Sequence, residues 1–579
     1  MTQSRCRLLL FFPMNEPFAA VVNAGKTPWK SKLNRRRTIK KLDYVYPSGL
    51  LSIAAYAKAR LPELDIRILD GNVVMGQLAD EHPEQVPELS LEQYFVACRA
   101  AVADFRPDLI GISTLFCSNY SDLRELVAFW RRSVPEAVMV GGGHLTAAVF
   151  QRAFADRIDF DAICGGEGEI PMAELCQAWM EGRHQAYLAE SKVWATPSKL
   201  AADPSFQPAR KLLDNLDDIP PYDFSLLVHQ DVYFNSSRYF FIIESDESLR
   251  EMFIFSTRGC PYHCVFCASQ NVHGHQVRSY SVERIRQDIL HYHRAFGISR
   301  FIFYDDHFLV DKPRAIAILD FVAEQGLRAE IPTPAFFSLD DDVAAAMARA
   351  GIREVNITIE SGNPDTLRHI MHKPGTLEMA GRAVAALHRA GILAVSNILI
   401  GLPGETPDSI EQGVQYLLTT DINWFQCFVA APLPGSRMWD VCEENHYFTE
   451  PDPMVMDFKR CVIRTPDFTP EYIEHKVYEM NLRLNFIHNY DMRIGNYAGA
   501  LRIFERILTT VIDTHAFAYY FAARCCLALG LGEQYARYKS GYEAMVATYS
   551  FWQAWVREFN LPPLPGVPAG FPARIQEAE

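Results

Sequence analysis

Short apolar runs alternate with helical stretches in two separate parts of this chain, and that rhythm constrains the fold most. In the first part, residues 49–61 and 120–133 carry apolar side chains at the spacing of a helix face. The apolar runs expected to form strands are residues 7–12, 65–70, 109–113, 137–140 and 162–164. Strands that alternate with helices are typical of a parallel sheet, so we expect an α/β domain here.

The alternation resumes near residue 251 and stops near residue 445. Its candidate strands are residues 253–256, 300–304, 329–332, 354–359, 394–400 and 424–429. Six strand–helix units predict a partial (β/α)6 barrel, whose functional site lies at the carboxyl ends of the strands. Beyond the barrel the pattern is helical, and residues 495–529 resemble one tetratricopeptide-like helix pair.

The length of 579 residues also requires more than one domain, because a single hydrophobic core stops growing at roughly 250–300 residues. We expect an N-terminal α/β domain over residues 1–180 and a linker region over 181–250, where residues 217–222 are rich in turn formers. The barrel is expected over 251–445, and an α-helical C-terminal domain over 446–579.

The charge balance restricts the partners that the chain can bind. Its 70 acidic and 56 basic side chains give a formal net charge of −14, which argues against a nucleic-acid partner. The N-terminal apolar segment is too short for a signal peptide, and no apolar run approaches the roughly 18–20 residues that cross a bilayer. We therefore expect a cytoplasmic protein with no membrane partner, in which the 13 cysteines are metal ligands and buried thiols.

Only one group of cysteines is tightly spaced. Cys260, Cys264 and Cys267 follow the first barrel strand, at spacings of four and three residues. Cysteine thiolates normally hold iron–sulfur clusters, and three of them leave one iron open for a ligand that is not protein. The alternative is zinc, which in a structural site takes four ligands, and His263 lies too tightly within the loop to be a comfortable fourth.

This CxxxCxxC pattern, with the aromatic Phe266 before the last cysteine, resembles the radical S-adenosylmethionine (SAM) superfamily. The resemblance implies a 4Fe-4S cluster on the three cysteines, whose open iron binds SAM and whose electron cleaves it to a 5′-deoxyadenosyl radical. It also implies an electron donor of the flavodoxin or ferredoxin type. The residues that it assigns to cofactor binding are Phe266 of the cysteine motif, Asp306 and Glu360 at strand ends, and Ser396 on the fifth strand.

The N-terminal region is similar to the Rossmann-like cobalamin-binding domain that precedes many radical SAM domains. Glycines at strand ends let the backbone approach a bulky ligand, and helix N-termini suit its phosphate. The resemblance assigns cobalamin binding to Ser48, Gly49, Asp70, Ser113, Thr114, Gly142, Gly143, His144, Gly166 and Glu167.

One departure concerns the ligand of cobalt. Cobalamin domains of the methionine-synthase type carry a histidine two residues after an aspartate, whereas Asn72 follows Asp70 at that spacing here. The resemblance therefore implies that cobalt binds without that histidine, either with another protein ligand or with none. His144 is an alternative ligand that we expect to contact the corrin edge or a phosphate instead.

The two resemblances together imply a cobalamin-dependent radical SAM methyltransferase, which moves a methyl group from SAM through cobalamin to a carbon of a small biosynthetic molecule. A cyclase or rearrangement enzyme of the magnesium-protoporphyrin ester cyclase type has the same two domains. RNA methylthiotransferases share the segment at residues 401–406, but they need a second cysteine trio that we do not find. A non-catalytic cobalamin or redox sensor is the alternative from a different class.

Overall fold

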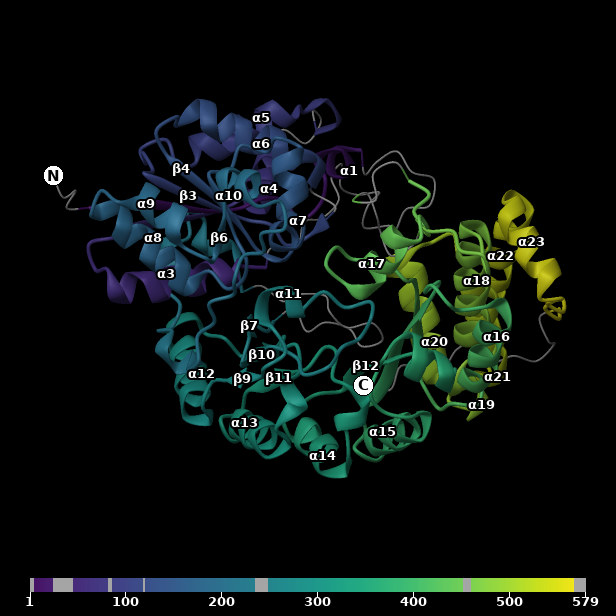
Figure 1. Ribbon diagram of the computed structural model, residues 1–579. Coiled ribbons are helices and arrows are strands. Elements are labelled where there is room, and N and C mark those ends of the chain that lie inside the picture. Colours follow the sequence, from purple (N-terminus) through teal and green to yellow (C-terminus); the bar gives the residue numbers. More distant parts are fainter. Residues whose placement is uncertain are drawn as a thin grey trace.

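The computed structural model describes residues 5–23, 45–81, 86–117, 120–234, 248–450, 454 and 460–566 (Figure 1). Its first sheet has the strand order β2-β1-β3-β4-β5-β6 and is parallel except for β6. These strands are β1 (Arg7–Phe12), β2 (Asp65–Asp70), β3 (Leu109–Ser113), β4 (Val138–Gly142), β5 (Ala162–Cys164) and β6 (Trp194–Ala195). The chain order reverses between β1 and β3, and ligands of such open sheets bind outside the carboxyl ends of the strands at that point.

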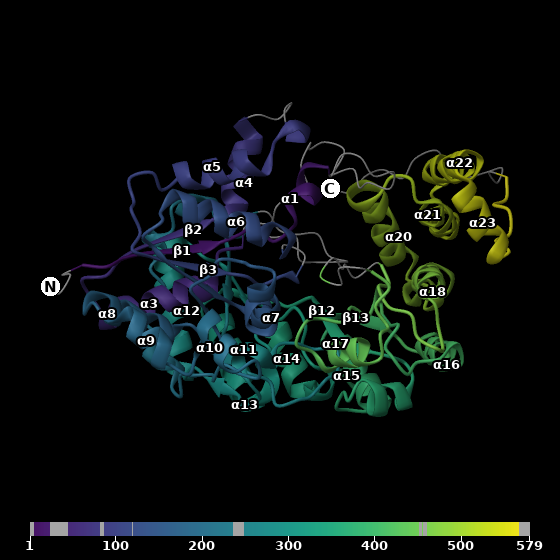
Figure 2. The same cartoon turned by 45° about the horizontal axis from the view of Figure 1, so that its top comes forward.

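The five strands expected in this sheet are all present, and only β4 departs from its expected bounds. The short antiparallel strand β6 comes from the stretch that we expected to be a linker, so the sheet continues past residue 180. Figures 1 and 2 show α4, α5 and α6 on one side of the sheet and α3 and α8 on the other. The helices of this region are α1 (Phe18–Val22), α3 (Ser48–Arg60), α4 (Gly71–Glu81), α5 (Leu91–Ala100), α6 (Tyr120–Ser133), α7 (His144–Ala155), α8 (Glu169–Met180), α9 (His184–Glu190) and α10 (Pro197–Ala202).

The six barrel strands lie within two residues of their expected positions, but they form two parallel sheets of three strands, β11-β10-β7 and β12-β13-β14. The strands are β7 (Glu251–Ile254), β10 (Arg300–Phe303), β11 (Arg328–Glu330), β12 (Glu354–Glu360), β13 (Leu393–Ile400) and β14 (Trp424–Val429). The expected continuous ladder is interrupted where β11 ends shortly before Pro332, which has no N–H to donate. The helices of this region are α11 (Gln270–His273), α12 (Val282–Phe296), α13 (Lys312–Glu324), α14 (Asp341–Arg349), α15 (Leu377–Arg389), α16 (Pro407–Leu417) and α17 (Arg437–Glu444).

A small ladder that the sequence did not predict closes the base of the cysteine loop. Strand β8 (Thr257–Arg258) pairs antiparallel with β9 (Arg278–Ser279), and Arg258 lies opposite Arg278. The chain between these two strands carries all three clustered cysteines. The pairing of β8 with β9 therefore holds the two ends of the cysteine loop together.

The C-terminal region is helical, as expected, and has a core of its own that includes Val395 of β13 and Trp424 of β14. Figures 1 and 2 show its helices on the side of the barrel away from the first sheet. The expected helix pair is present as α20 and α21, which pack on each other. The helices are α18 (Pro470–Leu482), α19 (Tyr490–Arg493), α20 (Tyr497–Arg506), α21 (Ala516–Leu529), α22 (Gly532–Thr548) and α23 (Ser550–Glu558), with the π-helix η9 (Arg483–Ile487) after α18.

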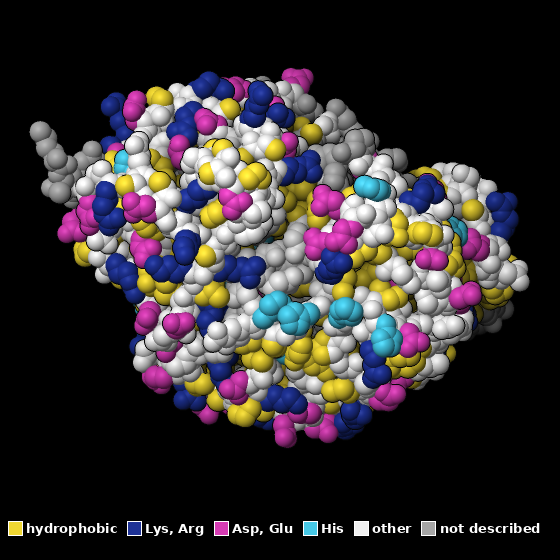
Figure 3. Space-filling model, in the orientation of Figure 1, with side chains coloured by type: hydrophobic (Ala, Val, Ile, Leu, Met, Phe, Trp, Pro, Cys, Tyr) yellow, Lys and Arg dark blue, Asp and Glu magenta, His cyan; other side chains and the backbone are white. Residues whose placement is uncertain are grey.

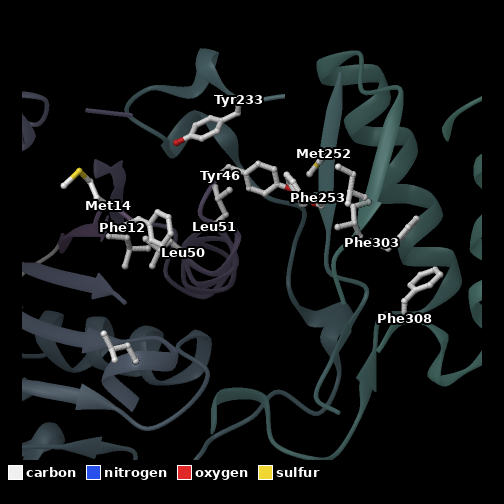
Figure 4. Packing of buried hydrophobic residues seen from close by; sticks show 14 of the residues in the cluster. Phe12, Met14, Tyr46, Leu50, Leu51, Tyr233, Met252, Phe253, Phe303 and Phe308 are labelled. Carbon is white, nitrogen blue, oxygen red and sulfur yellow. The ribbon is translucent and has the colours of Figure 1, made fainter. Parts of the chain in front are cut away.

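Buried aromatic side chains join the first sheet to the barrel (Figure 4). The Tyr46 hydroxyl, just before α3, donates to the carbonyl oxygen of Phe253 in β7. Its ring packs edge-on against Phe224 and Tyr233, at centroid distances of 5.1 and 6.3 Å. These contacts are directional as well as apolar, so they fix how the sheet meets the first barrel strand.

Lysine and arginine side chains are mixed with aspartate and glutamate over the face seen in Figure 3, and histidines gather near its middle. Among the residues that the structure describes, no helix has both the length and the apolar character needed to cross a membrane.

Candidate cofactor sites

The three clustered cysteines lie together on the loop between β8 and β9, and all three are half-buried free thiols. Burial raises the pKa of Cys260 and Cys264 to about 11, and the nearby Cys267 adds to the rise in both. The Cys267 pKa is also raised by burial. Iron binds thiolates, so cluster assembly at this loop must release protons.

A lysine that the sequence analysis missed supplies positive charge beside these thiols. The Lys373 ammonium lowers the pKa of all three cysteines, against the larger effect of burial. Its Nζ lies 5.9 Å from the centroid of the Phe266 ring and 3.1 Å from Glu360 Oε1. Both side chains of the ion pair are only 8% exposed. Lys373 follows β12 by 13 residues, and nothing in its local sequence marks it.

Glu360 is the last residue of β12, where we expected a SAM contact. Its φ of 71° is in the left-handed region, which is costly for a residue with a side chain. The register of β12 against β13 shifts between Ile357 and Glu360. Such strain persists only where the surroundings enforce it, and the Glu360 side chain is held in a buried pair with Lys373.

The other two residues expected at the SAM site differ in exposure. Asp306 follows β10, is exposed, and accepts a hydrogen bond of 2.8 Å from Ser269 Oγ of the cysteine loop. The negative charge of Asp306 also raises the pKa of Cys260 and Cys267. Ser396 is fully buried in β13, and its hydroxyl donates 3.3 Å to the Asn397 carbonyl oxygen. The structure thus brings Asp306, Glu360 and Phe266 to the cysteines, and places Ser396 within the adjoining strand.

A hollow opens at the carboxyl ends of the first sheet, where the expected cobalamin residues converge. Ser113, Gly142, Gly143 and Gly166 all line it, together with apolar side chains such as Trp194. Gly143 has a φ of 96°, and a Cβ there would lie 2.4 Å from the Thr114 carbonyl oxygen. A backbone this close can be made only with glycine.

Two of the expected cobalamin residues point into the protein. Thr114 is fully buried and its hydroxyl contacts the Gly142 carbonyl oxygen and Thr146 Oγ1, at 3.2 and 3.1 Å. Asp70 accepts hydrogen bonds from Asn72 and from the Tyr233 hydroxyl. Burial raises the Asp70 pKa to about 6. Both residues shape the ends of their strands, and neither lines the hollow.

Ser48 and Gly49 start helix α3, which adjoins the same end of the sheet. Ser48 is half-buried, and Gly49 is exposed with open space where a side chain would lie. The next residue, Leu50, lines the hollow. The first turn of α3 therefore borders the hollow, although its two predicted residues do not line it.

His144 begins helix α7 and reaches the cysteine loop. Its ring lies 5.8 Å from that of His273 in an edge-on arrangement, and it also contacts the backbone of Ala268. Burial lowers the His144 pKa to about 4, and His273 adds to that effect. The imidazole is therefore neutral at pH 7 and lies between the carboxyl end of the first sheet and the cysteine loop.

Glu167 also reaches across to the cysteine loop. It forms a buried ion pair of 2.6 Å with Arg278 and one of 3.3 Å with Arg258. The sequence predicts that Glu167 binds cobalamin, and it predicts no role for Arg258 or Arg278. Arg258 directly precedes Gly259-Cys260, which was the one available signal.

The residues of the two candidate sites suit a 4Fe-4S cluster and cobalamin better than they suit a single zinc ion. Within the described part of the chain, no three histidine, cysteine or acidic side chains converge on a point where one metal ion could bind. A cluster of four irons takes its thiolates at separate corners, so three neighbouring half-buried thiols suit it. The glycine-lined hollow likewise suits the close approach of a bulky ligand.

Comparison with known proteins agrees with this arrangement. The B12 binding domain family matches residues 39–176, and the Radical SAM superfamily matches residues 254–417. An uncharacterized methyltransferase of Pyrococcus horikoshii is 28% identical over 409 residues, covering 69% of this chain and 79% of the relative. Cytidylyl-2-hydroxyethylphosphonate methyltransferase of Streptomyces wedmorensis is 26% identical, covering 63% and 72%.

A solved structure shares the fold across most of the chain. It is the radical S-adenosylmethionine methyltransferase TsrM from Kitasatospora setae, with cobalamin and a 4Fe-4S cluster bound. Its identity is 16% and its TM-score 0.56, covering 83% of this chain and 88% of that one.

The chain is thus a radical SAM protein with a B12-binding domain ahead of the radical SAM domain. More narrowly, this is the domain arrangement of the cobalamin-dependent radical SAM enzymes, with a 4Fe-4S cluster, SAM and cobalamin as the cofactors. The expected α/β fold with a helical C-terminal region is confirmed.

Proposed function

We propose that this enzyme is a methyltransferase that moves a methyl group from SAM, through cobalamin, to a carbon of a small molecule. The observation that carries the proposal is the contact of His144, at the carboxyl end of the first sheet, with the cysteine loop of the barrel. A hollow suited to cobalamin therefore adjoins a loop suited to the cluster, so one substrate can reach both.

The proposed roles of the residues follow from their positions. Cys260, Cys264 and Cys267 hold three irons, and Lys373 stabilises the thiolate forms. Asp306 and Glu360 lie near Cys267 and would bind the amine of SAM beside the cluster. When bound, the cluster supplies the electron that cleaves SAM, and cobalamin carries the methyl group.

The glycines of the first sheet have the second proposed role. Gly142, Gly143 and Gly166 bring backbone and no side-chain bulk to the hollow, which would receive cobalamin. Burial keeps the His144 ring neutral beside it. An electron donor of the flavodoxin or ferredoxin type would reduce the cluster.

Support for methyl transfer to a small molecule also comes from the relatives. Two of them are named methyltransferases. TsrM has been solved with tryptophan and a SAM analogue bound, at 16% identity and a TM-score of 0.54. The amino acid in that structure favours a substrate of similar size.

The test is anaerobic reconstitution with iron, sulfide and cobalamin, followed by incubation with trideuteromethyl-SAM and a reductant, with Cys260→Ala as the control. We expect S-adenosylhomocysteine and the deuterated methyl group on the extracted cobalamin, with 5′-deoxyadenosine as well if transfer is radical. Formation of 5′-deoxyadenosine without any label on cobalamin would contradict methyl transfer and favour a cyclase or rearrangement. Bound cobalamin with neither product would favour a sensor.

A further inference from the structure

One buried carboxylate of the first domain holds the cysteine loop at three points. Glu167 is 3% exposed, and its Oε1 lies 2.6 Å from Arg278 Nη2 and 2.8 Å from His273 Nδ1. Its Oε2 lies 3.0 Å from Arg278 Nη1 and 3.3 Å from Arg258 Nη1. Burial alone would raise the Glu167 pKa, but the hydrogen bonds from His273 and Arg278 hold it well below its usual range.

The three partners mark out the whole cysteine loop. Arg258 and Arg278 lie opposite each other in the β8–β9 ladder that closes the base of the loop. His273 ends helix α11 within the loop, and Cys260 follows Arg258 by two residues. A displacement of Glu167 would therefore move both ends of the loop and its far side together.

A second carboxylate reinforces the same junction. Glu169 Oε1 lies 2.7 Å from Arg258 Nη2 and accepts a 2.5 Å hydrogen bond from Ser52 Oγ of helix α3. Arg258 Nη2 also lies 2.9 Å from that hydroxyl oxygen. Glu169, Ser52 and Arg258 are all buried, so helices α3 and α8 are joined to strand β8 through directional contacts.

The position of Glu167 in the chain links this network to the hollow at the end of the first sheet. The preceding residue, Gly166, lines the hollow at the end of the first sheet. One peptide unit therefore separates the wall of the hollow from the group that grips the cysteine loop. Buried ion pairs add little stability over apolar packing, but they fix geometry through directional, bidentate contacts.

We propose that Glu167 is a positioning residue, which fixes the distance and orientation between the cluster and cobalamin by holding the cysteine loop against the cobalamin sheet. The proposal rests on the location of the two cofactor sites and does not require that the reaction be methyl transfer. It replaces the direct cobalamin contact that the sequence suggested for Glu167.

The test measures the distance between the two cofactors directly. In the reconstituted full-length protein, cob(II)alamin and the reduced cluster are both paramagnetic, so pulsed EPR reports their separation without any turnover. We expect one narrow distance distribution in the unaltered protein and a broader or shifted one in Glu167→Gln. The matched control is Glu251→Gln, which breaks the buried pair with Arg300 at the opposite end of the barrel strands and should leave the distribution unchanged.

A second readout follows the loop itself. Loss of charged hydrogen bonds should let the loop open at least about tenfold more often, so Glu167→Gln should lose iron to a chelator about tenfold faster than Glu251→Gln. His273→Ala removes one partner and leaves both arginines paired, so it should fold even where Glu167→Gln does not, with a smaller effect in the same direction. The proposal would be overturned if Glu167→Gln had the same distance distribution and the same iron-loss rate as the unaltered protein. If only His273→Ala folds, the same result in that variant would overturn it. Both readouts, the distance between the cofactors and the rate of iron loss, can be measured even if the protein forms no methylated product. Failure of the proposed methyl transfer is therefore distinguishable from failure of this proposal.

Discussion

Glu405 shows how a residue in a family-like segment can serve the fold. It follows β13, is 1% exposed, and accepts hydrogen bonds of 2.8 and 2.9 Å from the backbone N–H groups of Gly401 and Leu402. The carboxyl group therefore closes the turn at residues 401–406. Burial raises its pKa to about 7.

The raised pKa predicts a pH-dependent stability. Ionising Glu405 costs the folded protein more than the unfolded chain, so its contribution is complete below pH 4.5 and is lost as pH rises through about 7. The loss amounts to about 3 kcal/mol. Glu405→Gln cannot ionise, so its urea unfolding midpoint should fall less between pH 5 and pH 8 than that of the unaltered protein. Parallel pH profiles for the two proteins would refute this.

Lys373 predicts a pH dependence of cluster assembly. Lys373→Met removes the cation that lowers the thiol pKa values and leaves the buried Glu360 unpaired, at a cost of about 3–5 kcal/mol. We expect less iron per chain after reconstitution at pH 7, with partial recovery at pH 8.5. Lys373→Arg keeps the charge and should load nearly as well as the unaltered protein. Full loading of Lys373→Met at pH 7 would show that the cation does not matter.

At the scale of elements, the sequence predicted every strand of four or more residues, because apolar runs and their spacing are local properties. It missed β6, β8 and β9, which have two residues each and no period to detect. Of the residues that line the hollow, it named Ser113, Gly142, Gly143 and Gly166, since glycine at a strand end is a local signal, and it missed the apolar side chains. The partners of Glu167 lie 91 to 111 residues away, so only the fold could reveal them.

The turn from β4 into α7 carries the next prediction. Gly143→Ala would place a Cβ 2.4 Å from the Thr114 carbonyl oxygen, at a φ of 96°. The backbone must shift at the wall of the hollow, so cobalamin binding followed by absorbance should weaken about tenfold or more. Gly182→Ala is the matched control, because its φ of 73° is also left-handed and nothing lies within 4 Å. Equal binding by the two variants would remove Gly143 from the site.

At the scale of the whole molecule, the C-terminal helices cover one edge strand of the second barrel sheet. Strand β14 is that edge, and unpaired edges invite association with other chains. Asn485, in the π-helix η9, accepts from the Phe425 N–H and donates to the Phe425 carbonyl oxygen, both at 2.8 Å. The helical region therefore supplies hydrogen-bond partners to backbone groups at this edge of the sheet.

Removing that side chain should loosen the edge. Asn485→Ala leaves two buried backbone groups of Phe425 unpaired, which costs about 2–4 kcal/mol. Amide hydrogen exchange at Phe425 should accelerate, while Asn445→Ala, whose exposed side chain bonds only within its own helix end, should leave it unchanged. Unaltered exchange in Asn485→Ala would mean that α18 and η9 protect β14 by packing alone.

The most direct test of the account is the cofactor content of anaerobically reconstituted protein. The unaltered chain should bind about four irons and one cobalamin. Cys260→Ala should lose the iron and keep the cobalamin, whereas Cys427→Ala, which alters a half-buried thiol of β14 outside the loop, should keep both. Full iron content in Cys260→Ala, or loss of iron in Cys427→Ala, would contradict the assignment of the cluster to this loop.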